Sequence, residues 1–142
     1  MNVIVDASVA VKWFVDEVGS AQALDLRASH TIAAPDILLI ECHNAFLNKV
    51  RRQTMSRDRA IQLENVFSAS AIEIFSSTPF LSDAFRIALD LGGAIYDCIY
   101  VAAAIATDRV LVTADERLMT KVATSSLATD RVKLLSDFAS GA

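Results

Sequence analysis

The chain has few of the residues that build glycine-rich phosphate loops, disulfide frameworks or zinc sites. It contains four glycines, two cysteines and two histidines in 142 residues. No P-loop or dinucleotide-binding fingerprint is present, because both need closely spaced glycines. Cys42 and Cys98 lie in apolar helical surroundings, so we interpret them as buried reduced thiols rather than a disulfide. His30 and His43 do not complete a zinc-ligand pattern with them.

Long apolar segments are also missing. The longest uninterrupted apolar run follows Asp97 and is far shorter than the roughly 18 residues that a membrane helix needs. The N-terminal residues MNVIVDAS form a strand pattern without the basic region and cleavage site of a signal peptide. We therefore expect a cytoplasmic protein that makes no contact with a membrane.

Aromatic residues are scarce as well, at 7%, although hydrophobic residues make up 54% of the chain. The core must therefore be aliphatic, which favours helices packed on a buried sheet over a β-sandwich. Charged residues, at 21%, are too few for a disordered chain. The length and the lack of a linker indicate a single domain over residues 1–142.

Short β-branched apolar segments alternate with helical segments along the chain. The expected strands cover residues 3–5, 31–33, 71–75, 110–113 and 132–135. The expected helices cover residues 8–15, 21–28, 35–52, 56–70, 79–91, 94–106 and 115–122, with Ser8 and Ser20 as N-caps of the first two. Residues 123–129 are expected to form a surface loop. This alternation predicts an α/β fold of three layers, α/β/α, with a central parallel sheet of four to five short strands.

Four carboxylates interrupt these apolar segments: Asp6, Glu41, Asp97 and Asp115. No lysine or arginine lies within five residues of Asp6, Glu41 or Asp97 in the sequence, whereas Arg117 follows Asp115 by two. A buried carboxylate without a partner is costly. A divalent metal ion relieves that cost, because hard cations prefer oxygen ligands. Simpler roles remain open at this point. Asp6 and Asp115 suit helix N-caps, Glu41 suits a solvent-facing stripe, and Asp97 suits a first helical turn that reaches solvent.

Small polar residues accompany the acids. Ser8 follows Asp6 by two residues, and Thr113 precedes Asp115 by two. Their hydroxyl groups are placed to orient carboxylates or to hold water. Asn44 follows Glu41 by three residues and shares its helical stripe.

A basic segment stands out in a chain whose net charge is −4. Residues 49–59 hold five basic residues, opposed only by Asp58: Lys49, Arg51, Arg52, Arg57 and Arg59. One interpretation is a solvated helix end, where basic residues complement the helix dipole. Beside an acidic metal site, we favour contact with a phosphate backbone.

Four motifs together resemble the PIN-domain ribonucleases, and in particular the VapC-type toxins of toxin–antitoxin pairs. In order, they are VIVDASVAVKWF, PDILLIECHNAF, YDCIYVAAAIA and LVTADERL, and they span Val3 to Leu118. The resemblance implies an acidic pocket that binds Mg²⁺ or Mn²⁺ through Asp6, Glu41, Asp97 and Asp115, supported by Ser8, Asn44 and Thr113. Some relatives carry one further acid near the last motif. Glu116 is adjacent here, but helical geometry should turn it away.

The resulting hypothesis is a metal-dependent endoribonuclease, the toxin of a toxin–antitoxin pair, that hydrolyses phosphodiester bonds in RNA such as tRNA or rRNA. The basic segment would bind the RNA backbone. Two alternatives are a catalytically inactive PIN-like module that binds RNA or protein, and a structure-specific DNA nuclease. The resemblance further implies a homodimer and a cognate antitoxin protein.

Overall fold

The structure is a computed structural model that describes residues 2–125 and 130–140, and its centre is a five-stranded parallel sheet. The strands are β1 (Asn2–Val5), β2 (Thr31–Pro35), β3 (Glu73–Phe75), β4 (Val110–Thr113) and β5 (Val132–Leu134). Their order in the sheet is β3-β2-β1-β4-β5. The predicted parallel sheet of four to five short strands is therefore confirmed.

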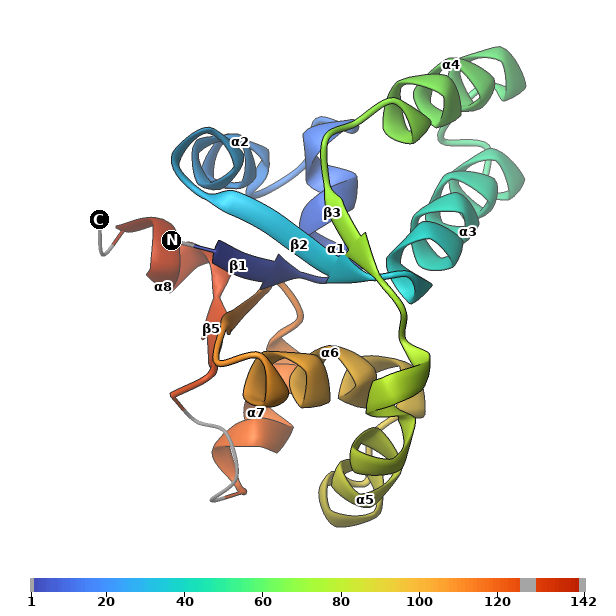
Figure 1. The fold of residues 1–142 in the computed structure, drawn as a ribbon. Helices are drawn as coiled ribbons and strands as arrows, with labels where there is room; N and C mark the ends of the chain where they lie inside the picture. Colours follow the sequence, from blue (N-terminus) through green and yellow to red (C-terminus); the bar gives the residue numbers. More distant parts are fainter. Residues whose placement is uncertain (1, 126–129, 141–142) are drawn as a thin grey trace.

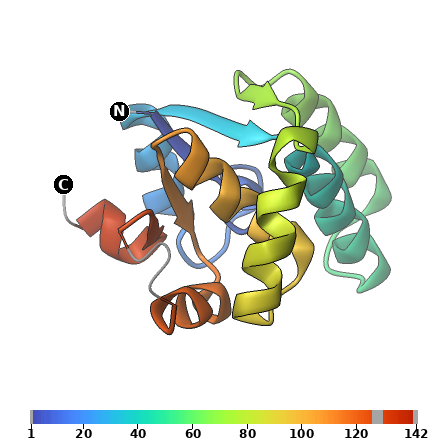
Figure 2. The ribbon, with the colours of Figure 1, turned by 60° about the horizontal axis from the view of Figure 1, so that its bottom comes forward.

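Helices cover both faces of the sheet, which confirms the three-layer architecture (Figure 1). One face carries α1 (Ala7–Ala10), the 3-10 turn η1 (Val11–Trp13), α2 (Ser20–Ser29), α3 (Ile37–Arg51) and α4 (Arg57–Ser68). The other carries η2 (Thr78–Phe80), α5 (Leu81–Leu91), α6 (Ile95–Ala106) and α7 (Glu116–Ala123), seen from their own side in Figure 2. The last helix, α8 (Leu135–Ser140), packs against α2 and β5.

The chain changes direction across the sheet between β1 and β4. From β1 it builds outward through β2 and β3, and it then returns to add β4 and β5 on the other side. In open α/β sheets, ligands bind at such a switch point, outside the carboxyl ends of the strands. Asp6 directly follows β1, and Asp115 lies two residues beyond β4. The topology thus brings both aspartates to the crevice where a ligand is expected.

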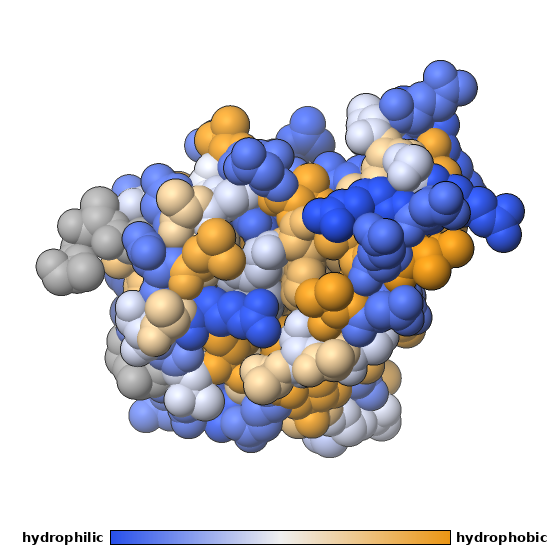
Figure 3. Space-filling model, turned by 90° about the horizontal axis from the view of Figure 1, so that it is seen from above, coloured by the Kyte–Doolittle hydropathy of each residue, from blue (hydrophilic) through white to orange (hydrophobic). Residues whose placement is uncertain are grey.

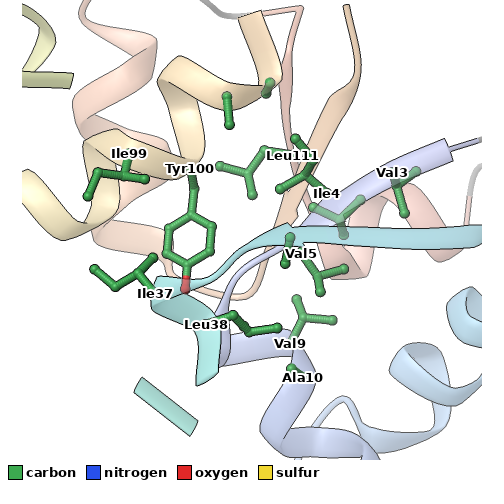
Figure 4. Packing of buried hydrophobic residues seen from close by; sticks show 14 of the residues in the cluster. Val3, Ile4, Val5, Val9, Ala10, Ile37, Leu38, Ile99, Tyr100 and Leu111 are labelled. Atoms are coloured by element: carbon green, nitrogen blue, oxygen red, sulfur yellow. The ribbon is translucent and has the colours of Figure 1, made fainter. Parts of the chain in front are cut away.

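Helix α6 forms the centre of the core on its face of the sheet. Its residues from Cys98 to Ala104 are all buried, as are all or nearly all residues of β1 and β4. Strands buried on both faces are uniformly apolar, which explains why they have no alternating pattern. Tyr100 is among the largest fully buried side chains, and its hydroxyl points toward the start of α3 beside Ile37 and Leu38 (Figure 4).

The two predicted serine caps are wrong. The N-cap of α1 is Asp6, whose carboxylate accepts a hydrogen bond from the Val9 amide, and Ser8 lies inside the helix. The helix expected to reach residue 15 also ends at Ala10 and tightens into η1. The N-cap of α2 is Gly19, at φ 91°, so that Ser20 begins the helix itself. The Ser20 hydroxyl instead donates to the Val15 carbonyl.

Several other boundaries agree with the prediction or differ by a few residues. Strand β4 covers the expected residues, and Ser56 and Asp115 cap α4 and α7 through their side chains. Strand β3 begins two residues later than expected, and β5 ends at Leu134 because Leu135 begins α8. Most of the surface loop expected over residues 123–129 lies outside the described residues.

Within the described residues, no single helix is long and apolar enough to cross a membrane. The bent pair Thr78–Leu91 and Ile95–Ala106 reaches the required length and composition only when the two segments are taken together.

Candidate active site

Asp6 is the most buried of the four acids, at 6% exposure, and hydrogen-bond donors reach both of its oxygens. The Ser8 hydroxyl donates to Oδ1 at 2.5 Å, and the Thr113 hydroxyl donates to Oδ2 at 2.5 Å. The Val9 amide is 3.4 Å from Oδ1. These contacts hold the carboxylate in one orientation at the carboxyl end of β1.

The same two hydroxyl groups connect the ends of β1 and β4. Ser8 Oγ accepts a hydrogen bond from the Ala114 amide at 2.9 Å, and Thr113 Oγ1 accepts one from the Asp115 amide at 3.1 Å. Each hydroxyl therefore donates to Asp6 and accepts from the loop after β4. The position of Asp6 is thereby coupled to that of Asp115.

Burial raises the pKa of Asp6 to about 6, and the nearby charge of Asp97 adds to this effect. The hydrogen bonds from Ser8, Thr113 and Val9 act in the opposite direction, because they favour the charged carboxylate, but they do not outweigh the desolvation. Asp6 is therefore ionised at neutral pH only at a cost, which a cation in the site would remove.

Glu41 is half-buried on α3 and is held by a residue from the opposite face of the sheet. The Tyr100 hydroxyl of α6 donates to Glu41 Oε1 at 2.5 Å. Burial raises the pKa of Glu41, and the charge of Asp97 raises it further. The sequence gave no sign that the hydroxyl of Tyr100 reaches α3.

Asp97 and Asp115 complete the group. Asp97 lies in the first turn of α6, where burial raises its pKa, the charge of Asp115 raises it further and Lys121 lowers it. Asp115 caps α7, since its Oδ1 accepts from the amides of Arg117 at 2.9 Å and Leu118 at 3.3 Å. The capping role proposed for Asp115 is thus real. Sequence reasoning missed Lys121, because it lies on α7 and approaches Asp97 only in the fold.

The donor chemistry of the four acids fits a hard divalent cation, because such ions prefer oxygen ligands. Asp97 is electrostatically coupled to each of the other three acids. In the described part of the chain, no lysine, arginine or histidine lies within salt-bridge distance of any of them. No three His, Cys, Asp or Glu side chains among residues 2–125 and 130–140 form a ready metal-binding group. Common ligation by three or more of these acids therefore requires side-chain rotation.

The remaining predicted residues are spread over several surfaces. Asn44 is exposed and has no described hydrogen bond to an acid. Lys49 and Arg52 line a cleft together with Ser8, whereas Arg57 lines an apolar groove between α3 and α4. Glu116 lines a separate cavity that also contains Lys12 and Gln22. The other two, Arg51 and Arg59, are exposed.

Comparison with known proteins identifies the family. The PIN domain family profile matches residues 3–124, a range that contains all four acids. A curated relative, Ribonuclease VapC3 from Pyrobaculum aerophilum, is 32% identical over 127 residues, covering 85% of this chain and 95% of the relative.

Solved structures share the fold at low sequence identity. A Pyrobaculum aerophilum protein, PAE2754, aligns over 99% of this chain and 88% of its own, with a TM-score of 0.74 and 19% identity. A toxin–antitoxin complex from Klebsiella pneumoniae contains a chain that aligns over 94% of this one and 97% of its own, with a TM-score of 0.65 and 13% identity. Sequence motifs, sheet topology and family match agree, and the chain belongs to the PIN-domain family.

Proposed function

We propose that this protein is a metal-dependent endoribonuclease that hydrolyses phosphodiester bonds in RNA and acts as the toxin of a toxin–antitoxin pair. The observation that carries the proposal is the electrostatic interaction of Asp97 with Asp6, Glu41 and Asp115 at the switch point of the sheet, with no salt bridge to any of the four acids among the described residues. The similarity to a VapC ribonuclease supports the same activity.

Mg²⁺ or Mn²⁺ would be held by the four carboxylates. When bound, such an ion polarises a phosphate oxygen and lowers the pKa of a coordinated water. The chain itself supplies the orientation of the ligands. Ser8 and Thr113 hold both oxygens of Asp6, and the amides at the start of α7 hold Asp115. Lys121 adds a positive charge near Asp97, on the side of α7.

Single-stranded or looped RNA, such as a segment of tRNA or rRNA, is the substrate we propose. A duplex in A-form hides its bases in a deep, narrow groove, so an accessible single strand is easier to recognise. The basic residues at the end of α3 would bind its backbone. This part of the proposal accounts for a cluster of positive charge in a chain of net charge −4.

A cognate antitoxin and a second copy of this chain are the proposed protein partners. The antitoxin would insert a segment into the acidic groove, where an arginine would compete with the metal ion for the carboxylates. The fold shared with a chain of a toxin–antitoxin complex supports this partner. Both cysteines are free and buried, which suits the reducing cytoplasm we propose as its location.

The test is cleavage of a mixed pool of tRNA and rRNA by the antitoxin-free protein, with Mg²⁺ or Mn²⁺ in one arm and EDTA in the other. We expect metal-dependent cutting by the wild type and none by Asp97→Asn. Binding of RNA without cutting would favour the inactive binding module. Cutting confined to structured DNA would favour the DNA nuclease.

A further inference from the structure

A polar cleft of about 330 Å³ lies next to the acid site, between α1 and α3. Its lining includes Ser8 at one end and Asn48, Lys49 and Arg52 along α3. Since Ser8 donates to Asp6, the cleft begins beside the most buried acid and ends at the basic end of α3. Seen from above, strongly hydrophilic side chains gather on the side of the molecule where α3 and α4 lie (Figure 3).

The basic segment is divided in the fold. Lys49 and Arg52 line the cleft, and Arg57 lines the groove between α3 and α4 together with apolar residues such as Phe46 and Ile61. Arg52 is exposed and forms no ion pair with any residue that the structure describes. Two of the five basic residues, Lys49 and Arg52, therefore line the same cleft as Ser8, beside the active site. Of these two, Arg52 is available to a ligand.

Glu17 supplies the negative charge of this cleft. Its Oε2 lies 3.5 Å from Lys49 Nζ, and its Oε1 lies 3.2 Å from Lys12 Nζ. Lys49 is only 27% exposed at its side chain, so this contact lies close to the cleft wall rather than in open solvent. Glu17 occupies the position relative to Lys49 that the oxygen of a bound anion would take.

The backbone at Glu17 is held in place by the loop before α2, and its carboxylate by Lys12. The Glu17 amide donates to Ser20 Oγ at 2.9 Å, and that hydroxyl donates to the Val15 carbonyl at 2.9 Å. Lys12 Nζ also donates to the Val18 carbonyl at 2.7 Å. The loop before α2 thus fixes Glu17, whereas Lys49 extends to it from another element. An incoming anion could draw Lys49 away without disturbing the loop.

We propose that this cleft binds a phosphate of the RNA backbone adjacent to the phosphate that is cut, with Lys49 and Arg52 as its ligands, and that Glu17 competes with it for Lys49. The inference rests on the proposed nuclease function. Arginine pairs well with phosphate through parallel N–H donors, and lysine adds a point charge. Ser8 lines the cleft and donates to Asp6, so the cleft lies beside the acids. This proximity favours a phosphodiester over an acidic peptide, because a nucleic-acid strand bound in the cleft would present its next phosphate to the acids.

The experiment compares two double variants that remove equal charge. Lys49→Gln/Arg52→Gln removes the cleft ligands, and Arg57→Gln/Arg59→Gln removes two cations on α4 as the matched control. Affinity for a short fluorescent oligouridylate is measured by anisotropy over a salt series, in EDTA so that the strand stays intact. Melting curves verify the fold of each variant.

We expect the cleft variant to bind more weakly than the control. The slope of log K against log salt should fall by about 0.7 for each lost phosphate contact, and by less in the control. Equal losses in the two variants, or no measurable binding by the wild type, would overturn the proposal. Competition by polyglutamate as effective as that by unlabelled oligouridylate would overturn it too, since it would indicate a general anion site.

A double-mutant cycle tests the role of Glu17. Glu17→Gln should tighten binding several-fold in the wild type, because Lys49 is released to the phosphate. The same change in a Lys49→Gln background should have little effect. An equal gain in affinity in both backgrounds would show that Glu17 acts only as a distant negative charge, and would refute its competition with phosphate for Lys49.

The two proposals fail separately. Binding through Lys49 and Arg52 without any RNA cleavage would refute the proposed nuclease activity but not the proposed phosphate site in the cleft. Metal-dependent RNA cleavage combined with equal losses in the two double variants would refute the cleft and leave the nuclease.

Discussion

Asp6 is contacted by three hydrogen-bond donors, yet its burial outweighs them and raises its pKa from 3.8 to about 6. A raised pKa means that the folded state binds the proton more tightly than the unfolded state does. Asp6 therefore contributes most stability below pH 4, and this contribution is lost as the pH rises to about 6. The full loss amounts to about 3 kcal/mol.

The Asp6→Asn variant should remove that pH dependence. Measured by urea unfolding in EDTA, the difference in stability between the variant and the wild type should increase between pH 4 and 6 and then level off. Glu41 and Asp97 also have raised pKa values. Their effects are present in both proteins and largely cancel in the difference, because the charge of Asp97 is the smallest of the causes that shift the pKa of Asp6. A difference that does not change with pH would contradict the assigned burial of Asp6.

Tyr100 is a positioning residue for the acid site, because its hydroxyl holds Glu41. The Tyr100→Phe variant keeps the ring in the core and removes only the hydroxyl that donates to Glu41. We expect Mn²⁺ affinity to fall by about tenfold, as is usual when a hydrogen bond to a metal ligand is lost. Tyr96→Phe is the matched control, because Tyr96 lies on the same helix and is 56% exposed. Equal Mn²⁺ affinities of the two variants would show that the Tyr100 hydroxyl does not position a metal ligand.

At the scale of elements, strand β4 was predictable and helix α1 was not. Residues 110–113 form a β-branched apolar run whose signal is entirely local. The start of α1 depends instead on a choice between Asp6 and Ser8 as the cap. Thr113, which lies 107 residues from Asp6, contributes to that choice. Local sequence cannot report such a contact.

Two adjacent glycines after α5 should respond differently to substitution. Gly92 ends the helix at φ 71°, where an alanine is strained, so Gly92→Ala should cost about 1 kcal/mol. Gly93 has no positive φ, and an added Cβ would meet Lys121 and Cys98 only at 3.7–3.9 Å. Gly93→Ala should therefore be tolerated. Urea unfolding compares the two, and an equal loss of stability would contradict the assigned backbone conformation.

For the whole molecule, the sequence identified the four candidate acids, and the topology of the sheet explains how they come to the same region. The unpaired carboxylates and the alternation of strands and helices were visible in the sequence, as was the α/β class. The contacts of Tyr100 and Lys121 were not visible in the sequence. Tyr100 lies 59 residues from Glu41, and Lys121 lies on a different helix from Asp97, so both contacts depend on how α6 and α7 pack. The division of the basic segment between two surfaces was hidden for the same reason.

Thermal unfolding tests whether the folded protein binds a metal ion. A cation that binds only the folded protein should raise the melting temperature, by the equivalent of about 2.7 kcal/mol when its concentration is 100 times the dissociation constant. Asp97→Asn should lose this response and should be at least as stable as the wild type in EDTA, because it removes repulsion among the acids. Equal metal responses in the two proteins would place the ion elsewhere.

The most direct test of the central claim is Mn²⁺ binding followed by electron paramagnetic resonance of the free ion, with the wild type beside Asp97→Asn. Asp97 is the acid coupled to the other three, so its loss should affect the whole site. We expect saturable binding by the wild type and strongly weakened binding by the variant. Absence of saturable binding by the wild type, or equal binding by both proteins, would contradict the central claim.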